Sequence, residues 1–267
     1  YQNYSRHPAL VEICDVIFVN IYPYWEGINV AYAMYYVDLK IEELKNVVGD
    51  KEIIISETGW PSDGNTIDEA VPNLENARYY LINFVSWAES KNIKYFYFEA
   101  FDEPWKANYE GPQGAHWGIF DRFGNIKTGF EDVFEGVRIE DNWSGTEIIG
   151  GEGIPEILLT YIPPVGSENF LLGSVRHVVP RYNRIATFIF NGGGWWNKPT
   201  WDTPTVLIMP DGTWSCDIVT HPNDVNAAKI AVFILPQDIV PPRMSGESVL
   251  PQELYNLSLA YLEVSRT

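Results

Sequence analysis

The chain has 267 residues, of which 46% are hydrophobic and 15% aromatic, so it can bury a sizeable core and is long enough for two domains. Its 36 acidic residues outnumber its 18 basic ones, and the net charge of −18 makes nucleic acid and anionic membrane surfaces poor partners. No apolar run approaches the roughly 18–20 residues of a membrane helix, and no basic-then-apolar leader follows Tyr1, so we expect no membrane insertion and a natural start elsewhere.

Residues 1–136 alternate short apolar runs with longer amphipathic stretches. Nearly continuous apolar runs are typical of strands covered on both faces, and apolar residues at helical spacing indicate helices between them. The predicted elements, in chain order, are a strand at 15–22, a helix at 30–47, a strand at 51–57, a helix at 73–91, a strand at 93–98 and a short helix at 128–135. This order is that of a parallel βαβ sheet and predicts an α/β domain.

After residue 137 the pattern changes to short β-rich runs separated by proline and glycine turns. The predicted strands are 156–162, 172–179, 185–190, 205–209, 214–219, 229–235 and 258–264, with a short helix at 251–257. The Pro-Asp-Gly-Thr sequence at 210–213 predicts a hairpin turn. Strands at this spacing favour an antiparallel β-sandwich over 155–267, joined to the first domain by a glycine-rich linker at 137–154.

Cysteine and histidine offer no sign of a metal site. Cys14 and Cys216 lie far apart in apolar surroundings, which favours free thiols that pack as small hydrophobic side chains. The four histidines show no ligand spacing. We therefore expect no metal.

Acidic and aromatic residues gather where the three strands of the first domain end. Glu57 closes an apolar run, and because the carboxyl ends of strands build the active site of an α/β barrel, it is a candidate nucleophile or general acid/base. The alternative is a capping or salt-bridged acid at a strand exit. The exits of the neighbouring strands carry Tyr22, Tyr24 and Trp25, and Glu99, Phe101, Asp102, Glu103, Trp105 and Lys106. We interpret this set as a sugar-binding cleft.

Four motifs occur in order along this part: NIYPYW at 20–25, SETGWPS at 56–62, YFEAFDEPWK at 97–106 and HWGIF at 116–120. They resemble glycoside hydrolase family 17, the β-1,3-glucanases and related glucanosyltransferases of the bacterial or fungal-like branch. The resemblance implies a (β/α)8 TIM barrel, a retaining β-1,3-glucan hydrolase or transglycosidase, no cofactor, and an extracellular or cell-surface location. It also implies Glu57 as the nucleophile, polar contacts to substrate from Glu103 and Lys106, and glucose subsites lined by Tyr24, Trp60, Trp105 and Trp117.

The chain departs from that family at the acid/base residue. In the family this residue is the Glu of an Asn-Glu pair at the end of the fourth strand, and the chain has no Asn-Glu dipeptide. Residues 1–136 correspond only to about the sixth to eighth strands, whereas a complete barrel takes roughly 200–250 residues. We expect the acid/base outside this segment, in a preceding part of the protein or on a separate chain that supplies the N-terminal half-barrel. The alternative is a non-catalytic extracellular glucan-binding or structural protein derived from the fold.

The second domain contains a tryptophan-rich motif, GGGWWNKPTW at 192–201. With the sequences that follow it, the motif resembles β-sandwich modules appended to bacterial glycoside hydrolases, which implies carbohydrate binding. The glycine and proline residues of the motif predict a loop. In this loop, Trp195, Trp196 and Trp201 are candidates for stacking on sugar rings, and packing against the barrel or in the sandwich core is the equal alternative.

Overall fold

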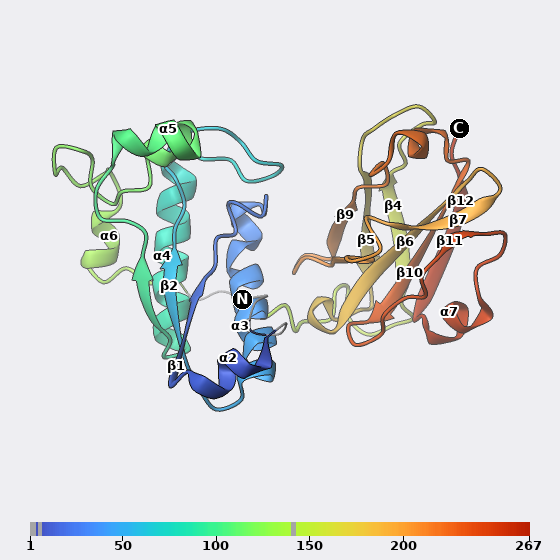
Figure 1. The fold of residues 1–267 in the computed structure, drawn as a ribbon, viewed down its shortest axis with the longest axis horizontal. Helices are drawn as coiled ribbons and strands as arrows, with labels where there is room; N and C mark the ends of the chain where they lie inside the picture. The colour runs from blue at the N-terminus through green and yellow to red at the C-terminus, as the bar shows by residue number, and fades with distance from the viewer. Residues whose placement is uncertain (1–3, 5–6, 140–142) are drawn as a thin grey trace. The chain divides into compact units, whose positions relative to one another are not determined.

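The structure is a computed structural model that describes residue 4, residues 7–139 and residues 143–267. The chain divides into two units, Tyr1–Trp143 and Ser144–Thr267, each with its own core (Figure 1). The division falls inside the 137–154 segment in which a linker is expected.

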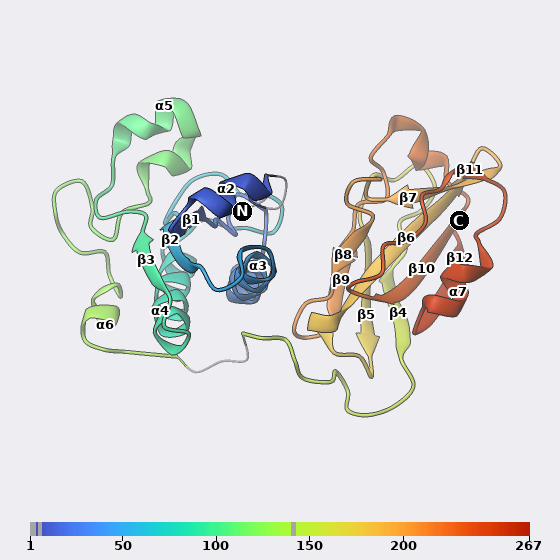
Figure 2. The ribbon, with the colours of Figure 1, turned by 60° about the horizontal axis from the view of Figure 1, so that its bottom comes forward.

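The first unit is built on three parallel strands in the order β1, β2, β3 (Figures 1 and 2). Its elements are α2 (Pro8–Ile13), β1 (Val16–Asn20), α3 (Ala33–Val48), β2 (Glu52–Thr58), α4 (Leu74–Ser90), β3 (Lys94–Tyr97), α5 (Ala107–Glu110) and α6 (Glu131–Phe134), with one-turn 3-10 segments at Val30–Tyr32, Pro104–Lys106 and Pro112–Ala115. The predicted strands and long helices are present, whereas α2, a six-residue helix, lies outside every predicted element.

Helices α3 and α4 cover one face of this sheet (Figure 2). Alternate residues of the strands, such as Ile17 and Ile55, point to that face and are completely buried. The two helices are joined by a hydrogen bond of 2.7 Å from Trp87 Nε1 to Asp38 Oδ1. The two helices therefore stabilise the sheet from one face, and the carboxyl ends of its parallel strands lie together at one edge.

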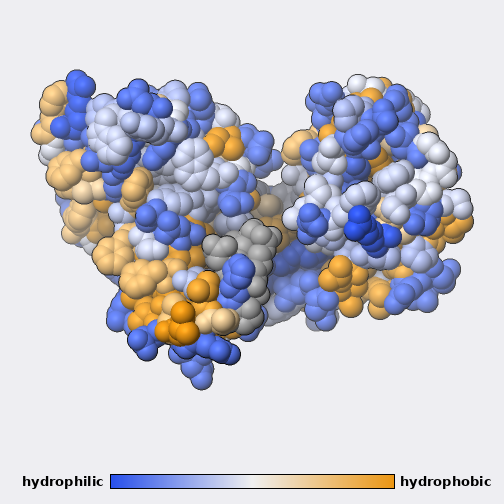
Figure 3. Space-filling model, in the orientation of Figure 1, coloured by the Kyte–Doolittle hydropathy of each residue, from blue (hydrophilic) through white to orange (hydrophobic). Residues whose placement is uncertain are grey.

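The opposite face of the sheet carries apolar side chains that are open to solvent. Phe18 on β1 is 49% exposed and Phe96 on β3 is 62% exposed, and Ile54, which pairs with Phe18, lies between them on β2. Figure 3 shows apolar side chains gathered over this part of the first unit, from the sheet to the region of α2. A parallel sheet is normally covered on both faces, so the second face of this sheet lacks the apolar covering layer that is expected for it.

The second unit consists of two antiparallel sheets. Its elements are β4 (Glu156–Tyr161), β5 (Leu171–Arg176), β6 (Asn183–Asn191), β7 (Gly194–Lys198), β8 (Thr205–Leu207), β9 (Thr213–Cys216), β10 (Lys229–Pro236), β11 (Ser245–Glu247), α7 (Gln252–Leu257) and β12 (Ala260–Ser265), with 3-10 segments at Pro180–Tyr182 and Pro222–Asn226. One sheet has the order β11, β7, β6, β10, β12, with β8 also paired to β6, and the other has the order β4, β5, β9.

The main core of this unit lies between the two sheets. Leu171 and Trp214 from the three-stranded sheet pack in one cluster with Ile189, Ile230 and Val232 from the six-stranded sheet. A second apolar cluster covers the other face of the larger sheet and includes Phe188, Trp195, Phe233 and Leu254 of α7. The unit thus consists of two sheets with one apolar cluster between them and a second on the outer face of the larger sheet.

Two local predictions for this unit need correction. The turn at 210–213 is present, with hydrogen bonds from the amides of Met209 and Gly212 to the carbonyls of Thr213 and Met209. It does not close a hairpin, because β8 pairs with β6 in one sheet and β9 pairs with β5 in the other. The tryptophan-rich motif, expected in a loop, forms strand β7, which pairs with β6 along its length.

Cys14 and Cys216 are both free, the first half-buried and the second buried, as their surroundings predict. Burial raises the pKa of the Cys216 thiol to about 12. Among the helices of the described residues, none is both long enough and apolar enough to cross a membrane.

Candidate active site

The register of β1 and β2 places Asn20 directly beside Glu57 at the carboxyl edge of the sheet. Asn20 Nδ2 donates a hydrogen bond of 2.9 Å to Glu57 Oε2, and the Tyr22 hydroxyl donates one of 3.0 Å to the same oxygen. Ser56 Oγ donates to Asn20 Oδ1 at 2.6 Å, so the amide is oriented with its NH2 group toward the carboxylate. Glu57 Oε1 receives no hydrogen bond from the described residues and remains available for a ligand.

Tyr22 acts as a neutral donor to Glu57. Burial raises the pKa of its hydroxyl, and the charge of Glu57 and the hydrogen bond to it raise the pKa further. The phenol therefore keeps its proton over the whole physiological range, and its hydrogen bond to the carboxylate persists.

The exit of β2 passes very close to the exit of β3. A Cβ on Gly59 would lie 2.1 Å from the carbonyl oxygen of Phe98 and 3.3 Å from the Trp117 ring, so only glycine fits there. The Phe98 amide also donates to the Thr58 carbonyl at 2.7 Å. This close approach joins the Glu57 segment to the acidic segment that follows β3.

The acidic segment is organised around the buried Lys106. Its ammonium pairs with Glu99 and, at 2.7 Å, with Glu103 Oε2, and it lies 4.2 Å from the centre of the Phe98 ring. Burial opposes the charge of Lys106, yet the two carboxylates together raise its pKa. Lys106 in turn lowers the pKa of Glu103, which is half-exposed.

Glu99 differs from its neighbour because it is largely buried. Burial raises its pKa above the ordinary value although Lys106 pulls in the opposite direction. Its Oε1 atom is buried and has no hydrogen-bond partner among the described residues. A carboxyl oxygen in this state can accept a hydrogen bond from a ligand hydroxyl or can hold a proton.

The aromatic residues expected to line glucose subsites fall into two groups. Tyr24, Trp60 and Trp117 are at most 1% exposed. They pack on one another, with the centres of both indole rings 5.6 Å from the centre of the Tyr24 ring, so they belong to the core of the unit. Their expected contact with sugar is therefore not available in this structure. Trp25 and Trp105 are 39% and 57% exposed and present open ring surface near the strand ends.

One polar network at this edge has no counterpart in the sequence prediction. Lys127 Nζ lies 2.7 Å from Asp102 Oδ1, 2.8 Å from Ser62 Oγ and 3.2 Å from the His116 carbonyl. Burial lowers the pKa of Lys127, and Asp102 opposes this shift. The network ties together the loops after β2 and β3, and a single lysine in a polar loop gives no sequence signal for such a role.

No group of three or more histidine, cysteine, aspartate or glutamate side chains converges as a metal-binding cluster in the part of the chain that the structure describes. At the strand-end site, Lys106 pairs with Glu99 and Glu103, and Lys127 pairs with Asp102.

The three tryptophans of the second unit also separate. Trp195 and Trp196 are neighbours on strand β7 and point to opposite faces of the sheet. Trp195 is buried beside Phe190, with ring centres 5.2 Å apart, so it packs in the core and is not a stacking surface. Trp196 is half-buried and Trp201 is 47% exposed, and both line a cavity.

Known proteins resemble the first unit. Residues 1–118 match the BtgE/BtgC glycoside hydrolase domain. A glucan 1,3-beta-glucosidase of Saccharomyces cerevisiae is 30% identical over 127 residues, which make up 45% of this chain and 41% of that protein. A probable glucan endo-1,3-beta-glucosidase (btgC) of Aspergillus fumigatus is 33% identical over 142 residues, covering 46% of this chain and 20% of that one.

A solved structure also resembles part of this chain. It is the glycoside hydrolase family 17 β-1,3-glucanosyltransferase of Rhizomucor miehei, which is 34% identical with a TM-score of 0.44 and coverage of 47% of this chain and 46% of that one. The chain thus spans less than half the length of each of these relatives. The match of residues 1–118 to a glycoside hydrolase domain and the names of these relatives agree with the resemblance to family 17.

Proposed function

We propose that the first unit supplies the nucleophile side of the active site of a retaining β-1,3-glucan hydrolase or transglycosidase. The observation that carries this proposal is the state of Glu57. Asn20 and Tyr22 both donate to its Oε2 and fix the carboxylate plane, while Oε1 receives no hydrogen bond from the described residues. The names of the relatives, glucan 1,3-beta-glucosidase and glucan endo-1,3-beta-glucosidase, support a glucan as the substrate.

In the proposed reaction, Glu57 Oε1 attacks the anomeric carbon while an acid protonates the leaving oxygen. A covalent glycosyl-enzyme forms, and water or the hydroxyl of an acceptor sugar then displaces Glu57 with the net configuration retained. The hydrogen bonds from Asn20 and Tyr22 hold the carboxylate in line for attack. The exposed faces of Trp25 and Trp105 offer stacking surface for glucose rings.

A retaining mechanism needs a second carboxyl group about 5–5.5 Å from the nucleophile. Glu99 and Glu103 are both ion-paired to Lys106, which suits them to bind sugar hydroxyls and to balance charge. We therefore assign the acid/base to a residue outside this chain segment. It would be carried by the strands that complete the barrel, either on the same polypeptide or on a separate chain.

The open face of the sheet supports this assignment. Phe18, Ile54 and Phe96 form an apolar surface on the side away from α3 and α4, where further barrel strands would cover them.

A polymeric glucan substrate also suits a protein that acts outside the cell, and we propose an extracellular or cell-surface location.

The proposal is tested with Glu57→Gln in the protein that contains the complementary barrel strands. Reducing-sugar release and product length from laminarin, a soluble β-1,3-glucan, are measured. Because the amide cannot form the glycosyl-enzyme, turnover should fall by at least about 10³-fold. Glu52→Gln, at the amino end of the same strand, is the matched control and should leave turnover unchanged.

Full turnover by the Glu57→Gln variant would contradict the proposed nucleophile. Binding of laminarin by the wild-type protein without any cleavage would instead favour the non-catalytic glucan-binding alternative.

A further inference from the structure

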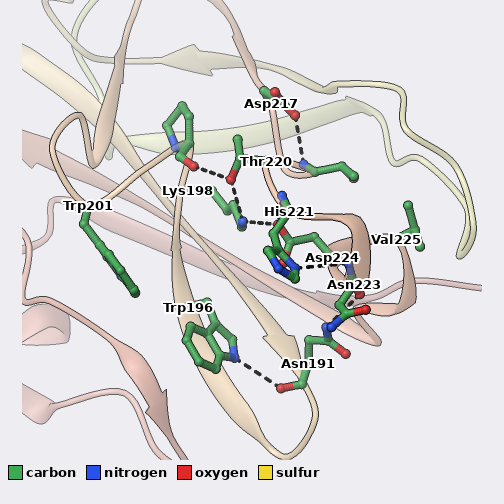
Figure 4. A network of polar contacts seen from close by, with 12 residues as sticks. Asn191, Trp196, Lys198, Trp201, Asp217, Thr220, His221, Asn223, Asp224 and Val225 are labelled. Atoms are coloured by element: carbon green, nitrogen blue, oxygen red, sulfur yellow. Dashed lines mark hydrogen bonds and ion pairs between the residues drawn. The ribbon is translucent and has the colours of Figure 1, made fainter.

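The second unit contains a cavity of about 500 Å³ beside strand β7 (Figure 4). This volume is in the range of small-molecule sites, roughly 300–1,000 Å³. Its walls come from the end of β6, from β7 and the segment that follows it to Trp201, and from the 220–224 segment. The cavity is thus built entirely within the second unit.

Two tryptophans form the apolar wall of the cavity. Trp201 Nε1 donates to the Met244 carbonyl at 3.0 Å, and Trp196 Nε1 donates to the Asn191 carbonyl at 3.3 Å. The guanidinium of Arg243 lies 4.2 Å from the centre of the Trp201 ring and covers one of its faces. Since the polar edges of both indoles are occupied by backbone, what they offer a ligand is ring surface.

The opposite wall is polar and centred on Lys198, which is only 4% exposed. Its ammonium forms an ion pair with Asp224 and donates to Thr220 Oγ1 at 2.8 Å. An ammonium group has three donors, so these two partners leave one donor without a described partner.

His221 and Asn223 add further groups to this wall, as Figure 4 shows. The backbone amide of Asn223 donates to His221 Nδ1 at 3.2 Å, and the backbone amide of His221 donates to Asp224 Oδ2 at 2.8 Å. With Nδ1 acting as acceptor, the ring proton of neutral His221 is assigned to Nε2, which makes that atom a donor. The Asn223 side chain provides both a donor and an acceptor.

The charges of the cavity favour a neutral ligand. Among the residues that line the cavity, Asp224 compensates Lys198, and the side chains of Thr220, Asn191 and Asn223 carry no charge; Arg243, which covers the Trp201 ring, is not one of them. A ligand that suits these walls has one apolar face for the indoles and several hydroxyl groups for the polar side. A pyranose ring has this combination, because its axial C–H bonds form an apolar face and its rim carries hydroxyls.

We propose that this cavity binds a neutral pyranose unit of a polysaccharide. The C–H face of the sugar lies on Trp201 and Trp196, and its hydroxyls bond to Lys198, His221 and Asn223. This site is separate from Glu57 and does not rest on the function proposed for the first unit.

The test uses the whole 267-residue chain and isothermal titration calorimetry with methyl β-D-glucopyranoside, laminaritriose, cellotriose and glucuronate. At least one neutral sugar should bind, and Trp201→Ala should weaken that binding at least about tenfold. Trp201 is half-exposed, so its loss leaves the core intact. Tyr182→Ala, which removes an exposed aromatic ring of the same unit outside the cavity, is the matched control and should not change the affinity.

Asn223→Ala provides an independent variant, because the hydrogen bonds of Asn223 that hold the loop come from its backbone. It should weaken sugar binding without lowering the melting temperature measured by circular dichroism. Unchanged binding in both Trp201→Ala and Asn223→Ala would overturn the proposal. So would the absence of binding by every sugar, or binding of glucuronate more than about tenfold tighter than the neutral sugars.

Discussion

The burial of Glu99 makes stability depend on pH in a direction opposite to that of most carboxylates, although its ion pair with Lys106 opposes the effect. Burial raises the pKa of Glu99 above its ordinary value of 4.5. Between the unfolded and folded pKa values, the folded state therefore holds more protons than the unfolded state. The stabilisation from protonated Glu99 is fully present below pH 4.5 and is lost as the pH rises through the folded pKa.

We predict that Glu99→Gln flattens this fall in stability above pH 4.5, because glutamine does not ionise and Lys106 keeps its ion pair with Glu103. Urea unfolding at several pH values from 4 to 7.5 would measure the effect. Glu103, whose pKa is lowered, contributes a change of opposite sign at lower pH and is present in both proteins. An exposed-site control, Glu69→Gln, should reproduce the wild-type profile. A Glu99→Gln profile that also coincides with the wild type would show that Glu99 titrates alike in the folded and unfolded states.

At the scale of elements, the β6–β7 hairpin shows what local sequence can and cannot predict. Asn191 pairs with Gly194, so the loop consists of Gly192 and Gly193, whose φ angles are 62° and 89°. Two-residue loops with positive φ at both positions are the favoured hairpin turns, and Gly-Gly is one of their signals. The sequence contained this signal, but the interpretation of residues 192–201 as a loop missed strand β7. It therefore also missed the alternation of side chains that places Trp195 and Trp196 on opposite faces of the sheet.

We predict that Gly193→Ala destabilises the chain by about 1–2 kcal/mol, the cost of a left-handed backbone for a residue with a Cβ. Gly192→Asn should change the unfolding free energy by less than about 0.5 kcal/mol, since asparagine accepts this conformation in such turns. A Cβ would meet nothing within 4 Å at either glycine, so both effects isolate the backbone. Equal effects of the two changes in urea denaturation would rule out this explanation.

Other elements of the fold depend on contacts that no local pattern contains. The βαβ order of the first unit follows from apolar runs and helical spacing, and the strand-end position of Glu57 follows from that order. Whether an aromatic ring at a strand end is open or buried depends on which segments pack over it, and this decides between Trp105 and Trp60. Likewise, the division of β8 and β9 between two sheets is set by their distant partners β6 and β5.

At the scale of the whole molecule, the first unit has an ordered polar site at the carboxyl edge of its sheet and an apolar sheet face that is open to solvent. The edge has a carboxylate, Glu57, held by two hydrogen-bond donors, and ion pairs from Lys106 to Glu99 and Glu103. The face has large apolar side chains in solvent, including Phe18 and Phe96. Soluble proteins rarely expose contiguous apolar patches of this kind unless another surface covers them, so the open face supports the proposed requirement for further strands of the barrel.

This requirement predicts a property of the 267-residue chain on its own. The hydrophobic dye ANS should bind at the open sheet face and fluoresce, because Phe18, Ile54 and Phe96 lie on this face of three adjacent strands. The double variant Phe18→Ser/Phe96→Ser should remove most of this signal while leaving the helix-covered face unchanged. Tyr109→Ser/Phe123→Ser is the matched control, since both rings are highly exposed in the same unit but lie outside the strands.

If the control lowers dye fluorescence as much as the sheet-face variant, the open face is not a docking surface for the rest of the barrel. A selective loss would locate the surface that the proposed complementary strands would cover.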